Sequence, residues 1–276
     1  SFIISEDKLD FKQVITGNDT ANLVNKISQA QNINQLKFVI KNPRVLYPYR
    51  GEWQLEQNKN FFRVTFTGDY FFNYANRQGG MAVRFFAGKF LYNGAKTSNK
   101  QFETDRYHLN LTSANGYEDY TYSDYFIGRN KFENWGSQQI MTRDGGFKVR
   151  TDLLSDKIGK SDHWLVSANF TTDIPKKINP LELLPVKIPL KIFVDIGTSA
   201  ESWVKDAETN KFLFDAGLQL ALFKETLNIY LPVLYSRVFK DYFRSTLGDH
   251  RFLKTISFSI EIQRFSMRKI NHYIPL

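Results

Sequence analysis

The chain has 276 residues, no cysteine and a formal net charge of +9, which excludes disulfide frameworks, thiolate metal sites and cysteine nucleophiles. Aromatic residues make up 16% of the sequence, whereas the charged fraction of 24% is ordinary, so the excess lies in the aromatics alone. Lys and Arg are spread along the whole chain rather than gathered in a block, which argues against nucleic acid as a partner.

The N-terminal part combines strand patterns with one helix-like segment. Its first residues, SFIISEDKLDF, read as a strand and show no basic n-region with a cleavage site, so we expect the chain to begin within a longer protein. Thr20 to Gln31 is predicted to form a short helix. The even positions from 36 to 40 are apolar and alternate with Lys37 and Lys41, which predicts a two-faced strand.

The longest alternating stretch is FFRVTFTGDYFFNY, from Phe61 to Tyr74. One face carries Phe62, Val64, Phe66, Gly68, Tyr70, Phe72 and Tyr74, and the other carries Arg63, Thr65, Thr67, Asp69 and Asn73. Such a strand is long enough for a bilayer, which a tilted strand crosses in about nine to eleven residues. Phe71 falls on the polar face, which requires a packed interior at that point.

The two-residue period continues to the end of the chain. Strands are predicted over 164–171, 190–197, 212–222 and 255–263, each with one apolar and one polar face. Ser236 to Leu247 is instead predicted as a helix within a loop, because Val238, Tyr242 and Phe243 have helix-like spacing.

Turn signals separate the predicted strands. They are Asn42-Pro43, Asn58-Lys59-Asn60, the run from Asn76 to Gly80, Lys224-Glu225 and Gly248-Asp249. Longer polar segments lie at 94–105, 113–161, 174–189, 199–210 and 236–251. Short connections predict antiparallel hairpins, and short turns on one side with long loops on the other are typical of an outer-membrane barrel.

These patterns predict an all-β fold: an antiparallel transmembrane β-barrel of the outer-membrane type, forming one domain over residues 1–276 and belonging to a larger barrel. A helical membrane protein is excluded by the lack of a long apolar run, whereas barrel strands hide their hydrophobicity in alternation. The residues predicted to face lipid are Phe62, Val64, Phe66, Tyr70, Phe72, Leu218, Leu220, Phe258 and Ile260. The residues predicted to face the lumen are Arg63, Thr65, Asp69, Asp195, Asp215, Gln219 and Glu261.

The sequence contains no recognisable catalytic or metal-binding motif. Its four histidines show neither H-E-x-x-H nor ligand spacing, and no cofactor is expected. Asp195 and Asp215 are predicted either to act as a carboxylate pair or to form lumen salt bridges with Lys191, Lys211 or arginines.

The segment 113–161 is dense in Tyr, Asp, Gly and Arg and has no clean period. It is predicted either to enter the barrel as a plug or to form a long extracellular loop. Both interpretations stay open on the sequence.

Six segments, in this order, carry a family resemblance. They are VRFFAGKFLYN (Val83 to Asn93), GYEDYTYSDYFIGRN (Gly116 to Asn130), SQQIMTRDGGFK (Ser137 to Lys148), KIPLKIFVDIGT (Lys187 to Thr198), FLFDAGLQLALFKETLNIYLPVLYS (Phe212 to Ser236) and KTISFSIEIQ (Lys254 to Gln263). Together they resemble the C-terminal region of large envelope proteins of Bacteroidota. In those proteins a periplasmic metallopeptidase-like part of the aminopeptidase N (gluzincin) type precedes an outer-membrane barrel.

The resemblance implies a parent protein with a zinc metallopeptidase-like part, whose H-E-x-x-H and distant Glu have no counterpart in this chain. The expected function is therefore non-catalytic: a β-barrel in the bacterial outer membrane that anchors the peptidase-like part or a protein partner. Expected partners are the lipid bilayer with its lipopolysaccharide and other envelope proteins, without nucleic acid. An outer-membrane pore or transport barrel and a soluble β-sandwich binding domain are the alternatives.

Overall fold

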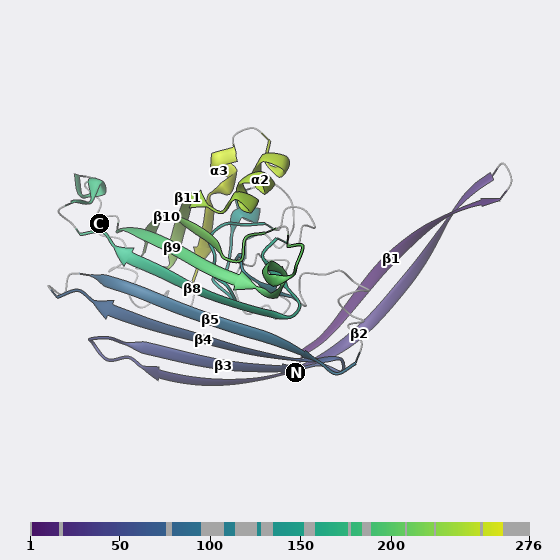
Figure 1. Ribbon diagram of the computed structural model, residues 1–276, viewed down its shortest axis with the longest axis horizontal. Helices are drawn as coiled ribbons and strands as arrows, with labels where there is room; N and C mark the ends of the chain where they lie inside the picture. Colours follow the sequence, from purple (N-terminus) through teal and green to yellow (C-terminus); the bar gives the residue numbers. More distant parts are fainter. Residues whose placement is uncertain are drawn as a thin grey trace.

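The computed structural model of the chain is mostly β and is built around one large antiparallel sheet (Figure 1). The structure describes residues 2–16, 19–75, 79–94, 108–113, 126–127, 135–151, 158–175, 178–183, 189–207, 209–223, 225–248 and 251–261. The antiparallel all-β prediction is confirmed. The sheet curves but is not closed into a barrel.

Every strand of the large sheet pairs with the next one along the chain. The strands are β1 (Phe2–Thr16), β2 (Asp19–Asn42), β3 (Tyr49–Gln57), β4 (Phe61–Asn73), β5 (Gly80–Tyr92), β8 (Trp164–Asp173), β9 (Leu190–Ser199), β10 (Leu213–Leu222), β11 (Leu227–Tyr235) and β12 (Ser257–Ile260). Only the step from β5 to β8 passes other strands, β6 (Leu109–Asn110) and β7 (Lys160–Ser161), which pair with each other. The helical elements are η2 (Trp135–Gln138), η4 (Pro180–Leu183), η5 (Ala200–Trp203), α2 (Arg237–Thr246) and α3 (Arg251–Thr255).

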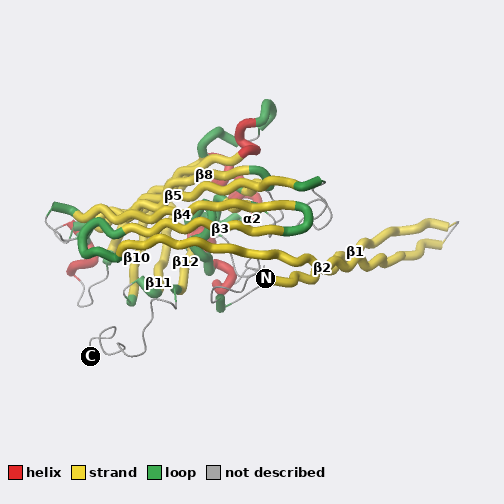
Figure 2. The backbone as a smooth tube through the Cα atoms, turned by 90° about the horizontal axis from the view of Figure 1, so that it is seen from below, coloured by secondary structure: helices red, strands yellow, loops and turns green. Residues whose placement is uncertain are grey.

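β1 and the first part of β2 form a two-stranded arm that extends away from the sheet (Figures 1 and 2). In the arm Phe2 lies opposite Ile33 and Thr16 opposite Asp19, and β2 then continues into the sheet beside β3. The predicted helix from Thr20 to Gln31 is therefore wrong. Unbroken pairing with β1 stabilises an extended backbone there, and such a partner strand is invisible to a local spacing argument.

The connections give the sheet two unlike ends. At one, which we call the turn end, the connections are 43–48, 74–79, 174–189 and 223–226. At the other, the loop end, they are 58–60, 93–163, 200–212 and 236–256, and the arm leaves from here as well. Long connections thus gather at the loop end, as the sequence predicts, with 58–60 and 174–189 as the exceptions.

A hydrophobic core fills the concave side of the sheet at the loop end. It joins residues of the strands, such as Phe61, Phe90 and Leu165, to others of the long connection between β5 and β8 and to helix α2. α2 confirms the predicted helix, and its Phe239 packs edge-on against Phe147 with ring centroids 6.2 Å apart. Within the described residues, no helix combines the length and apolar character needed to cross a membrane.

Candidate functional site

Burial along the strands runs against what water-soluble sheets show, because polar side chains are the buried ones. On β4, Arg63 and Thr65 are buried while their neighbours Phe62, Val64 and Phe66 are only half-buried. On β9, Asp195 is 0% exposed while Val194 and Ile196 are 43% and 41% exposed. The concave side of the sheet is therefore polar away from the loop-end core, and the convex side is largely apolar.

The residues predicted to face a lumen all lie on the concave side. Five of them, Arg63, Thr65, Asp69, Gln219 and Glu261, line a cavity of about 1280 Å³, and the other two, Asp195 and Asp215, are fully buried beside it. The residues predicted to face lipid lie at the opposite parity and are half-buried or exposed, although Tyr70 and Ile260 also contribute to the cavity wall.

Phe71 occupies the interior position that its register predicts. It lines both the large cavity and a smaller one of about 380 Å³ at the turn end. A Cβ atom at Gly80 would lie 2.6 Å from the Phe71 ring, so the absence of a side chain at Gly80 makes room for it. Phe71 is half-buried and faces both cavities, so the filled interior that the sequence requires at this point is not observed.

A row of polar side chains crosses seven neighbouring strands in register. Its members, from β2 to β10, are Lys41, Arg50, Asp69, Arg84, Asn169, Asp195 and Asp215, each directly opposite the next. We call this the cross-strand row. It begins with two basic residues at β2 and β3 and ends with two carboxylates at β9 and β10.

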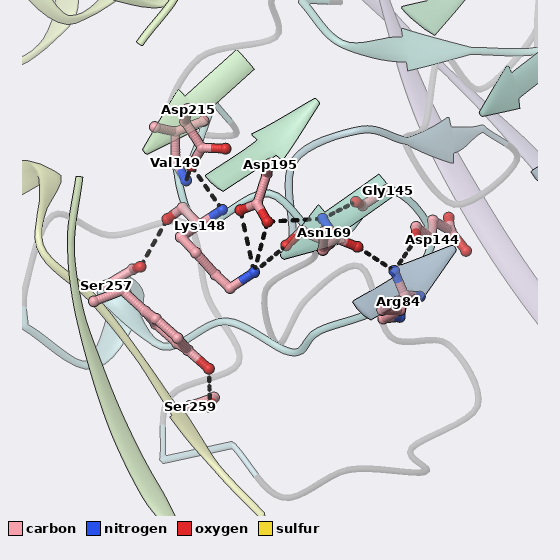
Figure 3. A network of polar contacts seen from close by, with 12 residues as sticks. Arg84, Asp144, Gly145, Lys148, Val149, Asn169, Asp195, Asp215, Ser257 and Ser259 are labelled. Atoms are coloured by element: carbon pink, nitrogen blue, oxygen red, sulfur yellow. Dashed lines mark hydrogen bonds and ion pairs between the residues drawn. The ribbon is translucent and has the colours of Figure 1, made fainter. Parts of the chain in front are cut away.

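We call residues 139–150 the inner segment. Residues 144–149 of this segment dock onto the part of the row from Arg84 to Asp215, which we call its acidic half because it ends in two carboxylates (Figure 3). Arg84 Nη1 donates to the Asp144 carbonyl at 2.7 Å, and Asn169 Nδ2 donates to the Gly145 carbonyl at 2.9 Å. The backbone N–H groups of residues 148 and 149 donate to Asp215 Oδ2 at 2.9 and 3.0 Å. Each of these strands thus supplies one side chain that binds the segment's backbone.

Lys148 is the one charged side chain of the inner segment that reaches the carboxylate pair. Its Nζ lies 3.2 Å from Asp195 Oδ2 and 2.6 Å from the Gly146 carbonyl, and it lies 5.6 Å from the ring centres of Phe193 and Tyr230. Ser257 on β12 completes the contacts by donating to the Lys148 carbonyl at 2.7 Å. The ion pair is buried, so it is a strong constraint on where the segment can lie.

The predicted salt bridges of the two aspartates had the wrong partners. Asp195 pairs with Lys148, whereas Lys191 pairs with Asp173 and Glu225 at the turn end, and Lys211 lies over the Trp203 ring. Asp195 and Asp215 do lie side by side, as a carboxylate pair requires. The register could have suggested their proximity, but nothing in the local pattern of 113–161 singled out Lys148.

The backbone of the inner segment also forms hydrogen bonds with residues in and next to β6. Gly145 N–H donates to the Asn110 carbonyl at 2.8 Å, and Phe147 N–H donates to the Leu111 carbonyl at 3.1 Å. At Gly145 a Cβ atom would lie 2.4 Å from the Leu111 backbone, so only glycine permits this approach. Near the start of the inner segment, Ile140 N–H donates to the Phe258 carbonyl at 2.8 Å. The backbone at Ile140 therefore covers part of the outer edge of β12.

The large cavity lies between the strands and the inner segment, and along β4 its lining runs from Arg63, near the loop end, to Phe71, near the turn end. Its wall on β2 to β5 includes Lys37, Lys41, Arg50, Arg63 and Arg84 against the acids Glu52 and Asp69. The inner segment contributes its floor from residues 139–144 and 148. The cavity is therefore bounded toward the loop end by the docked segment and by the core behind it.

Nothing in the described part of the chain assembles a metal site, since it holds no group of three or more His, Asp or Glu placed to share an ion.

No family model matches the sequence, and no curated protein matches it.

Proposed function

We propose that this chain forms part of a β-barrel in the bacterial outer membrane, with the convex side of its sheet in lipid. The single observation that carries the proposal is the reversed burial: ion pairs lie inside, and apolar side chains such as Phe38 and Val194, 60% and 43% exposed, lie outside. Water favours the opposite arrangement, in which sheets bury apolar faces and expose polar ones. Lipid favours the arrangement seen here.

The proposal requires the sheet to be completed by further strands. Lipid offers no hydrogen bonds to the backbone groups of an open edge. Among the described strands, residues 34–42 of β2 pair with β3 alone, whereas β12 is partly covered by Ile140. A strand beside residues 34–42 is therefore part of the proposed assembly, in keeping with the larger barrel that the sequence predicts.

The role we propose is that of an anchor for a periplasmic partner, with the loop end outside the cell and the turn end facing the periplasm. The gathering of long connections at the loop end supports this orientation. Support for the partner comes from the resemblance to envelope proteins that carry a metallopeptidase-like part before the barrel. The chain itself would then take no part in catalysis.

Trp53 tests the membrane placement, because it lies mid-strand on the convex side and is 52% exposed. In a variant that keeps Trp53 and changes Trp135, Trp164 and Trp203 to Phe, we expect lipids brominated on their tails to quench the fluorescence. The control moves the single tryptophan to Thr67, a cavity-lining position, where these lipids should quench little. Quenching of Trp53 by aqueous acrylamide alone, in a chain that stays out of vesicles, would refute the proposal.

A pore is the second candidate, and the polar cavity of about 1280 Å³ is the observation that favours it. The docked inner segment and the core behind it oppose conduction, so we expect no unitary conductance in a planar bilayer. Replacing residues 139–146 by a Gly-Ser linker of equal length, which keeps Phe147 in the core, should produce a leak. Steady conductance of the unaltered chain would favour the pore over the anchor.

A further inference from the structure

The cross-strand row is only half occupied. Its acidic half, from Arg84 to Asp215, is filled by the inner segment, which supplies carbonyl groups to Arg84 and Asn169 and an ammonium group to Asp195. Its basic half, Lys41, Arg50 and Asp69, faces the cavity. One continuous row therefore binds a peptide at one end and is open at the other.

The open half of the row carries more positive than negative charge. Lys41 and Arg50 are directly opposite each other on β2 and β3, a like-charge arrangement that destabilises a sheet unless an anion lies nearby. Arg50 contacts Glu52 and Asp69, with the second contact at 3.5 Å, whereas Lys41 forms no ion pair within the described residues. Lys37 and Arg63 add two more basic groups to the same wall. Lys37 shares Glu52 with Arg50, whereas Arg63 pairs with the buried Glu56.

The volume and length of the cavity suit an extended peptide better than a small molecule. Its volume of about 1280 Å³ exceeds the ~300–1,000 Å³ of ordinary ligand pockets. Along β4, the lining from Arg63 to Phe71 spans about 26 Å at ~3.3 Å per residue. An extended segment of about eight residues would fit this length.

We infer that the cavity is a docking vestibule for an extended acidic peptide segment, whose carboxylates meet the basic half of the cross-strand row at Lys41 and Arg50. A peptide is the favoured occupant because a peptide already fills the other half of the row. Opposite charges across such an interface steer association and fix register. The assignment of the vestibule to the periplasmic side rests on the proposed function, whereas the binding itself rests on the cavity alone.

The test uses the full chain in detergent and a fluorescein-labelled peptide of about eight alternating Glu and Ser residues, followed by fluorescence anisotropy at low salt. We expect saturable binding that weakens as salt rises, and binding about tenfold weaker in the double variant Lys41→Glu/Arg50→Glu. The double variant Lys205→Glu/Lys240→Glu, an equal charge change at two exposed positions of the loop end, should leave the affinity unchanged. If Lys41→Glu/Arg50→Glu does not fold, Lys41→Glu alone, at an exposed residue, carries the comparison.

Equal binding of a Lys-Ser peptide of the same length, an undiminished affinity in Lys41→Glu/Arg50→Glu, or no binding of the acidic peptide would each overturn the inference. The peptide-binding result and the lipid-quenching result test the two proposals independently. Peptide binding without lipid quenching of Trp53 keeps the vestibule and removes the membrane. Lipid quenching without peptide binding does the reverse.

Discussion

Replacing Val194 by Arg is expected to block assembly of the chain into membranes. Val194 lies mid-strand in β9, 43% exposed on the convex side, opposite Phe170 and Ala216 of the neighbouring strands. A charge at the bilayer midplane costs about 2–4 kcal/mol in a transmembrane barrel. The measurement is the fraction of chain that enters vesicles and becomes protected from protease, compared with the unaltered sequence.

The control places the same charge on the concave side. Thr67→Arg puts a guanidinium into the cavity, directly opposite Glu52, and should leave membrane assembly intact. In a water-soluble sheet Val194→Arg would not be the more harmful of the two substitutions. An arginine at an exposed position such as 194 then changes the free energy of unfolding by less than about 0.5 kcal/mol. A Val194→Arg chain as stable as the unaltered one in detergent-free buffer would therefore contradict the membrane placement.

Removing the Lys148 ammonium group is expected to cause a large loss of stability, because it breaks a buried ion pair. Lys148→Ala leaves Asp195, which is 0% exposed, without its cation and also removes a hydrogen bond to the Gly146 carbonyl. Breaking a buried ion pair from one side costs about 3–5 kcal/mol. We expect a loss of this size in the free energy of unfolding, measured by denaturant titration, together with faster proteolysis within residues 139–150.

Two variants separate the ion pair from mere loss of volume. Lys148→Met/Asp195→Asn removes both charges while keeping the shapes, and it should recover most of the stability, since neutral replacements of buried pairs are often well tolerated. Lys205→Ala, a lysine truncation at an exposed site, should change the free energy of unfolding by less than about 0.5 kcal/mol. A Lys148→Ala chain that matches Lys205→Ala would show that the ion pair does not hold the inner segment.

The strands were predictable because alternation is a local property of the sequence. The stretch from Phe61 to Tyr74 shows its two faces without any partner, and β8, β9 and β10 are recognisable in the same way. α2 was recognisable from its spacing of Val238, Tyr242 and Phe243. Each of these signals depends only on which side of the backbone successive residues occupy.

The predictions that failed concern contacts between distant segments. The local sequence from Thr20 to Gln31 predicts a helix, but its pairing with β1 stabilises a strand. Lys191 and Lys211 are near Asp195 and Asp215 along the chain, yet the cation beside Asp195 is Lys148, 47 positions away. A segment without periodicity carries no signal of where it docks, because its position depends on groups such as Asn169 and Ser257 that come from several strands.

Alternation and short turns are enough to predict the two-faced strands, their antiparallel order and the polar character of one face. The cross-strand row from Lys41 to Asp215 is visible only in the folded chain, because the register between strands sets which side chains are neighbours. The tertiary structure also decided that the inner segment fills the acidic half of that row and leaves the basic half facing a cavity. The inner segment docks at the acidic half because burying a carboxylate is costly. Asp195 can lie at 0% exposure only where a cation and hydrogen-bond donors surround it.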